Sequence, residues 1–193
     1  MSTPKSGLES RASHLLFAGI LASAAGPAAA ADDLFLKLEG IQGESNAAGH
    51  KDEIEILSYT QSLANSTARV GQAGGAGKTN CNPVTITKFV DRSSPVFMLY
   101  VANGRHLTRG VITVRRPGPT PFDYYKLTLD EVMIVEVEQS DTKLNFPNPA
   151  PPKAIEKVTL QARRYTWEYM GQTPSGAPLR VPTAWDCALN APG

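Results

Sequence analysis

The sequence is short of the residues that most often build catalytic and metal sites. Its 193 residues include two cysteines and three histidines, and aromatic side chains make up 7% of the chain. The two cysteines stand far apart, without the Cys-x-x-Cys spacing that is typical of a zinc site. We therefore expect neither a metal centre nor a bound cofactor.

An excess of charge of one sign is also missing. The chain has 19 Lys plus Arg and 18 Asp plus Glu, which leaves a formal net charge of +1. Proteins that bind nucleic acid or an anionic membrane surface by charge usually carry a basic excess or a basic patch. Beyond residue 30, no apolar run approaches the roughly 20 residues that cross a bilayer. Nucleic-acid binding and stable membrane insertion are therefore not expected.

Patterns that carry catalysis are absent as well. The Gly-x-Ser-x-Gly pattern around a nucleophilic serine does not occur. Glu53 and Glu55 resemble a carboxylate pair, but they alternate with Ile54 and Ile56, which is typical of the solvated face of a strand. We therefore predict that the protein is not an enzyme. An exported hydrolase, which is one of three functional hypotheses, has no nucleophile or base in its favour.

Two short motifs imitate ligand sites. Residues 74–79 read Gly-Gly-Ala-Gly-Lys-Thr, but Gln72 stands where a phosphate-binding loop needs its first glycine. The true motif is also followed by a helix, whereas a strand pattern begins at Pro83. The His50-x-x-Glu53 spacing likewise leads into a strand. We interpret His50 as a hydrogen-bonded loop histidine and expect no nucleotide or metal here.

What the sequence does contain begins with a leader. Two basic residues precede a short apolar run at residues 15–25, and small residues follow. An Ala-x-Ala pattern predicts signal cleavage between Ala30 and Ala31. The chain therefore divides into a cleavable signal peptide, residues 1–30, and a mature domain, residues 31–193. The mature protein is expected to be secreted or periplasmic, or cytoplasmic if the signal is not used.

The two cysteines both survive this cleavage. An exported protein meets an oxidising compartment, so Cys81 and Cys187 can form a disulfide bond. In the chain-entropy model, a bond that closes so long a loop stabilises a protein by about 4–5 kcal/mol. Spacing alone does not show whether their Cα atoms approach each other. Two buried free thiols remain the alternative.

The mature chain is dominated by strand patterns. Apolar and polar residues alternate in short segments rich in Val, Ile, Thr and Tyr, separated by turns with Gly and Pro. About eight strands with no internal repeat predict a mainly β, antiparallel sandwich or barrel. The expected strands are residues 33–39, 53–59, 83–89, 110–115, 122–129, 132–138, 157–162 and 165–169.

One short helix is expected between Ser94 and Gly104. Ser94 is suited to cap its first turn, Pro95 to occupy the first helical position, and Gly104 to end it. The residues between them are apolar on nearly all sides, which predicts a largely buried helix. Three other segments lack a strand or helix pattern: the polar residues 62–79, the proline-rich residues 145–152, and the tail from 172 to 193.

The order of these blocks resembles that of the Hcp family, the tube proteins of bacterial type VI secretion. The resemblance runs from about residue 32 to residue 190, and the order and spacing of the motifs are more specific than any one of them. The matching blocks are residues 33–38 with Gly40 to Ser45, residues 50–59, Gly74 to Lys78, Lys88 to Pro95, Gly104 to His106, and Trp185-Asp186 with Asn190.

The resemblance implies a fold and a mechanical function. The fold would be an antiparallel β-barrel of two packed sheets with one short flanking helix. The protein would form a homo-hexameric ring that stacks into a tube and carries effectors in its lumen, with spike, sheath and effector proteins as partners. The long polar loop of residues 62–78, which we call the ring-stacking loop, would contact the next ring. The contacting residues would be Ser66, Arg69, Val70, Gly71, Gly74, Gly75, Gly77 and Lys78.

The leader departs from this family pattern, because a tube subunit assembles in the cytoplasm and needs no export signal. Two hypotheses therefore stay open. The protein is either a ring-forming tube subunit or secreted relative, or an exported monomeric β-barrel binding module that does not form tubes. The state of assembly distinguishes the two.

Overall fold

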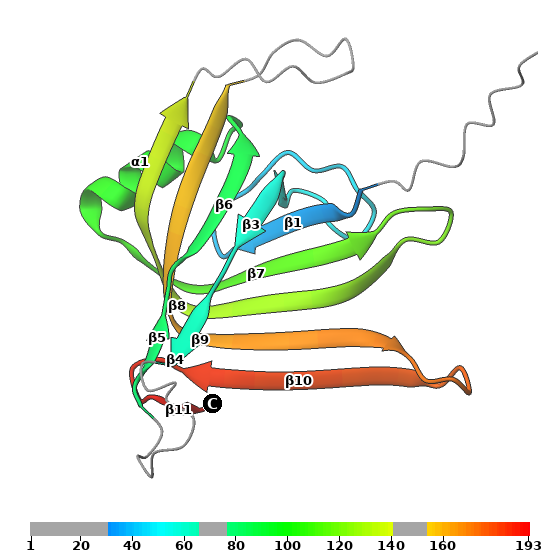
Figure 1. Ribbon diagram of the computed structural model, residues 1–193. Coiled ribbons are helices and arrows are strands. Elements are labelled where there is room, and N and C mark those ends of the chain that lie inside the picture. Colours follow the sequence, from blue (N-terminus) through cyan, green and yellow to red (C-terminus); the bar gives the residue numbers. More distant parts are fainter. Residues whose placement is uncertain (1–30, 66–76, 141–153) are drawn as a thin grey trace, which may run out of the picture.

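Antiparallel strands form nearly all of the regular structure. The computed structural model describes residues 31–65, 77–140 and 154–193. Figure 1 shows long curved strands with a single helix packed beside them. The elements are β1 (Asp33–Leu38), β2 (Ile54–Ile56), β3 (Ser58–Thr60), β4 (Leu63–Asn65), β5 (Thr79–Cys81), β6 (Val84–Phe89), α1 (Ser94–Asn103), β7 (His106–Arg116), β8 (Phe122–Ser140), β9 (Ile155–Gln172), β10 (Pro178–Asp186) and β11 (Ala191–Pro192).

Strand β9 determines how the main sheet is arranged. Its first part pairs with β6, from Phe89↔Ile155 to Val84↔Leu160, and its second part pairs with β10. Strand β8 runs along its other side almost throughout. The path β11-β10-β9-β8-β7-β1-β2 therefore branches at β9 into β6 and β3. This arrangement confirms the expected antiparallel β fold with one helix.

The barrel is not closed by hydrogen bonds among the described strands. β2 pairs with β1 and β3 pairs with β6, although only Leu57 separates β2 from β3 in the chain. The expected single strand over residues 53–59 is therefore two short strands that join opposite sides of the sheet. Both pieces share one alternating pattern, so the sequence does not show where the chain changes partner.

The core lies between the inward faces of these strands and the helix. Burial alternates along β6 and along parts of β8 and β9, as the sequence pattern predicted, whereas Phe35 in β1 and Thr113 in β7 are buried on the opposite face as well. The helix adds Phe97 and Tyr100 from one side. The core also includes Leu36, Ile54, Ile86, Ile112, Leu127, Leu129, Ile134, Val158, Leu160 and Tyr165.

A buried ion pair joins β6, β9 and the start of the helix. Lys88 and Glu156 are both fully buried, and Lys88 Nζ lies 2.9 Å from Glu156 Oε1. Lys88 also donates to Asp91 Oδ1 at 2.8 Å, and Ser94 Oγ donates to Glu156 Oε1 at 2.7 Å. Buried charges of this kind are tolerated when they are paired and hydrogen-bonded. The network therefore links the end of β6 to the start of α1 through the buried Glu156 of β9.

The helix differs from its prediction in two ways. Its N-cap is Ser93, and no side chain caps it; the Ser94 hydroxyl is bound to Glu156 instead. The helix is also only partly buried, because Met98 and Leu99 are 39% and 57% exposed. A helix that packs on one side buries only that side, whatever its sequence. The expected end at Gly104 is confirmed, with a left-handed φ of 63°.

Several strands are longer than predicted. Residues 122–140 form one strand where two were expected, and Glu131, with a φ of 52°, lies at the irregularity between them. β9 likewise joins two expected strands. No strand was expected in the tail, but β10 pairs with β9 from Pro178↔Gln172 to Asp186↔Arg164. β10 is exposed over most of its length, so it lacks the alternation that reveals a strand.

Candidate functional site: the loop stem, its disulfide and the outer strand

The structure describes only part of the predicted site. Gly77 and Lys78 of the expected ring-stacking loop lie just before β5, and Ala31 is exposed just before β1. The site can therefore be followed from the two ends of the loop. The other predicted residues, Ser66, Arg69, Val70, Gly71, Gly74, Gly75 and Ala30, lie outside the described residues.

Strands β4 and β5 form a stem for the segment between them. They pair as a separate two-stranded sheet, with Leu63 opposite Cys81 and Asn65 opposite Thr79. Asn65 and Thr79, which end β4 and begin β5, are therefore paired. No regular structure was expected in residues 62–79. The two strands have three residues each, which is too short for an alternating pattern to be visible in the sequence.

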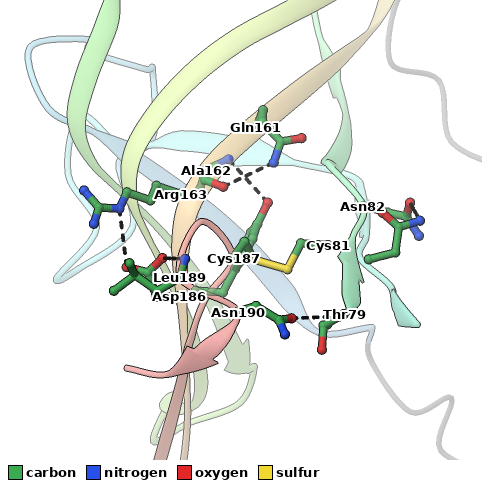
Figure 2. The surroundings of a disulfide bond; sticks show 12 residues. Thr79, Cys81, Asn82, Gln161, Ala162, Arg163, Asp186, Cys187, Leu189 and Asn190 are labelled. Atoms are coloured by element: carbon green, nitrogen blue, oxygen red, sulfur yellow. Dashed lines mark hydrogen bonds and ion pairs between the residues drawn. A yellow bond between two sulfur atoms is a disulfide. The ribbon is translucent and has the colours of Figure 1, made fainter. Parts of the chain in front are cut away.

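A disulfide bond fastens this stem to the C-terminal end of the chain. Cys81 in β5 is bonded to Cys187, just after β10, with a Cα–Cα distance of 6.2 Å and 106 residues between them in sequence (Figure 2). Both cysteines are half-buried and pack against the core. The Cys187 N–H also donates to the Arg163 carbonyl in β9 at 2.9 Å. Of the two alternatives for the cysteines, the structure therefore has the disulfide.

Hydrogen bonds on either side of the disulfide reinforce it. The Thr79 N–H donates to Asn190 Oδ1 at 2.8 Å (Figure 2), and Trp167 Nε1 donates to Gln61 Oε1 at 2.8 Å. Asn190 reaches Thr79 from a left-handed turn with a φ of 52°. The contact with Thr79 gives Asn190 of the closing motif a structural role that the sequence pattern did not reveal.

Asp186 organises the turn that carries Cys187. Its carboxylate accepts from the Leu189 N–H at 2.9 Å and pairs with Arg163 at 3.3 Å (Figure 2). The hydrogen bond from the Leu189 backbone is the main reason why the pKa of Asp186 lies below its usual value, and Arg163 contributes to the same shift. The Asp186 carboxylate is therefore ionised at neutral pH, and in that form it holds the turn through Leu189 and Arg163.

His50 lies in a second polar cluster and is part of the loop that joins β1 to β2. Its ring is buried and stacks on Phe35 with centroids 4.1 Å apart. Nδ1 lies 2.7 Å from Glu53 and Nε2 lies 3.2 Å from Asp123. The interpretation of His50 as a hydrogen-bonded loop histidine is confirmed.

Asp123 connects this cluster to β7. Burial raises the pKa of Asp123, but hydrogen bonds from Arg115 and His50 outweigh burial and hold the pKa below its usual value. The Arg115 Nε donates at 2.7 Å. Within the described residues, no group of three or more His, Cys, Asp or Glu side chains could hold a metal ion.

Strand β10 leaves the edge of the sheet open from Pro178 to Thr183, because β11 pairs only with Trp185 and Asp186. The Ala184 carbonyl accepts from the Gly193 N–H, on the side of β10 away from β9. Because backbone direction repeats every second residue, Pro178 and Pro182 face the same outward side. Neither has an N–H to offer, so this edge has few donors for another strand. Tyr169, Leu179 and Val181 on the β9–β10 hairpin are exposed; we call these three residues the hairpin patch.

No helix in the described part of the chain has the length and apolar character needed to cross a membrane.

The comparisons with known proteins agree with this architecture. Hcp1 of Pseudomonas aeruginosa is 30% identical over 147 residues, which cover 75% of this chain and 87% of that protein. The major exported protein of the same species is 26% identical over 138 residues, covering 70% and 79%. Hcp1 from Salmonella typhimurium has a TM-score of 0.65 and 26% identity, covering 85% of this chain and all of that one.

Two further matches bear on the assignment. A structure described as a type six secretion system protein has a TM-score of 0.74 at 22% identity and covers 84% of this chain, which shows a shared fold. The model of a family described as type VI secretion system effector, Hcp, matches residues 35–169, the span from β1 to the second half of β9. The chain therefore belongs to the Hcp family of type VI secretion proteins.

Proposed function

We propose that the mature protein, residues 31–193, is a ring-forming structural component of a type VI secretion system. It acts as a tube subunit or as a secreted relative, and its ring lumen carries effector proteins. The observation that carries the proposal is the open outer edge of β10 beside the hairpin patch, in a chain that belongs to a structural and secreted family. Exposed apolar groups on a sheet edge favour burial against another subunit.

The chemistry of this edge indicates how two subunits would meet. Pro178 and Pro182 remove two outward N–H donors, so a continuous β-ladder across the interface is disfavoured. Side chains of the hairpin patch would instead pack on a different surface of the neighbour. A contact between two different surfaces repeats around an axis and closes into a ring when the rotation fits.

The stem would direct the loop toward the next ring. β4 and β5 pair Asn65 with Thr79, and the disulfide holds the end of β5 on the C-terminal turn. Deletion of residues 70–77 is therefore expected to leave single rings intact and to abolish stacking. Loss of the folded barrel in this deletion would refute the assignment of the loop to stacking.

Export before assembly is part of the proposal. The leader at residues 1–30 would be cleaved after Ala30, and the mature protein would be secreted or periplasmic. The disulfide is compatible with an oxidising compartment, and one relative is named a major exported protein. The partners would be further copies of the chain and, at the tube, spike, sheath and effector proteins.

The same two observations favour a second candidate. An exported chain with a disulfide can also be a monomeric β-barrel binding module that does not form tubes. Light scattering behind a sizing column, with negative-stain images of the peak, tests both for residues 31–193. A mass of six subunits with visible rings supports the ring-forming component. A monomer at high concentration contradicts it and favours the binding module.

A further inference from the structure

The β4–β5 hairpin and the sheet beneath it are joined in an unusual way. Among the described strands, β4 and β5 pair only with each other. A hairpin of two three-residue strands is marginal by itself in water. The hairpin continues the β3–β6 pair, and the Asn82 N–H donates to the Ser62 carbonyl at 3.2 Å where the two pairs meet. Beyond that junction, side-chain and covalent contacts hold the hairpin on the barrel, whereas the main strands are fixed by long ladders.

The covalent contact is the disulfide. It joins the end of β5 to the turn after β10, and nearby hydrogen bonds include those from Thr79 to Asn190 and from Trp167 to Gln61. A single hydrogen bond of this kind contributes only about 1 kcal/mol to stability. The C-terminal turn has its own ties, since the Cys187 N–H donates to Arg163 and Asp186 accepts from Leu189.

We propose that the Cys81–Cys187 disulfide is a redox-controlled clasp: oxidised, it holds the β4–β5 hairpin on the C-terminal turn, and reduced, it releases the hairpin while the barrel stays folded. The device links the position of the stem to the redox state of the compartment. Its consequence for ring stacking rests on the function proposed above, whereas release of the hairpin does not.

The chemistry of release is thiol–disulfide exchange. Both cysteines are half-buried, so a small thiolate can approach the sulfur atoms. A dithiol reductant attacks one sulfur, and the Sγ–Sγ bond breaks. Two electrons and two protons pass to Cys81 and Cys187, which become thiols, and the reductant becomes its own cyclic disulfide. In an oxidising compartment the reverse reaction closes the clasp.

The barrel has what it needs to survive this step. β8 and β9 pair from Tyr125↔Tyr169 to Ser140↔Ile155, and the core includes fully buried Leu129 and Leu160. None of these contacts requires the disulfide. Opening of a weakly tied unit on a well-packed domain is the usual form of local unfolding.

Hydrogen exchange of the mature protein, with and without dithiothreitol, tests the proposal. Alkylation with iodoacetamide counts the thiols and verifies reduction. We expect the amides of residues 63–65 and 79–82 to exchange at least tenfold faster after reduction, with β7, β8 and β9 unchanged. The Cys81→Ala/Cys187→Ala variant should match the reduced protein and show no further response to dithiothreitol, which controls for the reagent.

A second variant distinguishes the disulfide from the hydrogen bond beside it. Asn190→Ala removes the acceptor of the Thr79 N–H. It should speed exchange slightly in the oxidised protein and strongly in the reduced one. Unchanged exchange of the stem after reduction would overturn the proposal, and so would loss of protection across the whole barrel.

Negative-stain images of the same samples separate this proposal from the proposed function. Stacks in the oxidised protein that disperse into single rings on reduction support both. Faster exchange of the stem in a protein that forms no rings in either state supports the clasp and contradicts the ring-forming function.

Discussion

Strands β7, β8 and β9 and the β4–β5 hairpin belong to one chain, but different interactions hold them in place. The long strands share ladders of many residues and bury a common core with the helix. The hairpin shares no ladder with them among the described residues, and it is tied by a disulfide and single hydrogen bonds. The barrel therefore supplies a rigid base, and the segment expected to contact partners is carried on a separately fastened part.

This difference has a physical reason. Burial of apolar side chains stabilises a structure in proportion to the area removed from water, and long paired strands bury much of it. A stem of three-residue strands buries little, so covalent and polar ties replace the missing burial.

Loss of the disulfide should have the largest effect on stability. Replacing both cysteines, Cys81→Ala/Cys187→Ala, removes a constraint on the unfolded chain and is expected to lower the free energy of unfolding by about 4–5 kcal/mol. Urea denaturation of residues 31–193 measures it, with the reduced wild-type protein as a control. A change below about 1 kcal/mol would mean that the bond hardly restricts the unfolded chain.

Breaking the buried ion pair tests the barrel itself. Lys88→Met leaves Glu156 buried without a positive partner and should cost about 3–5 kcal/mol in the same denaturation experiment. The double variant Lys88→Met/Glu156→Leu removes both charges and should recover most of the loss. If the double variant is as unstable as the single one, the cost comes from packing rather than from the unpaired charge.

Acid should weaken the cluster around Asp123. The pKa of Asp123 is lowered in the folded protein, so its contribution to stability is complete above its unfolded pKa of about 3.9 and is lost as pH falls through the lower folded pKa. Asp123→Asn should lower the free energy of unfolding by about 1–3 kcal/mol at pH 7. The variant should also flatten the fall in stability below about pH 4. An equal acid dependence in both proteins would contradict the assignment.

A charge in the hairpin patch should barely affect folding but should prevent assembly. Val181 is 52% exposed, so Val181→Asp is expected to change the free energy of unfolding by about 0.5 kcal/mol or less. Light scattering should show loss of the ring. Leu99→Asp, at an exposed position on α1, is the matched control. Rings that persist in Val181→Asp would remove the hairpin patch from the subunit contact.

The parts of the fold that the sequence predicted share one property. β1, β6 and β7 have one buried and one less buried face, so they alternate, and the end of the helix at Gly104 follows from its left-handed φ. Where exposure is nearly uniform the prediction was wrong: no strand was expected at β10, which is exposed over most of its length. The helix was expected to be buried because its apolar residues do not show which side meets the sheet.

The site could be predicted only as a set of separate pieces. The sequence placed the cysteines, the polar segment at 62–79 and the closing Trp-Asp motif in order. It did not decide between a disulfide and two free thiols, because a pairing across 106 residues depends on where β5 and the C-terminal turn meet in space. The hydrogen bond between Thr79 and Asn190 has the same long-range origin, and no local pattern signals it.

Alternation, turn residues and motif order are local or sequential properties, so they were sufficient to predict the antiparallel β class, the helix after Ser94 and the family of the chain. The folded chain was needed to show that the strand pattern after residue 53 splits at Leu57, that β10 leaves an open edge from Pro178 to Thr183, and that Cys81 meets Cys187. These features depend on which segments, far apart in the sequence, pack against each other in the folded chain. A local sequence pattern does not contain that information.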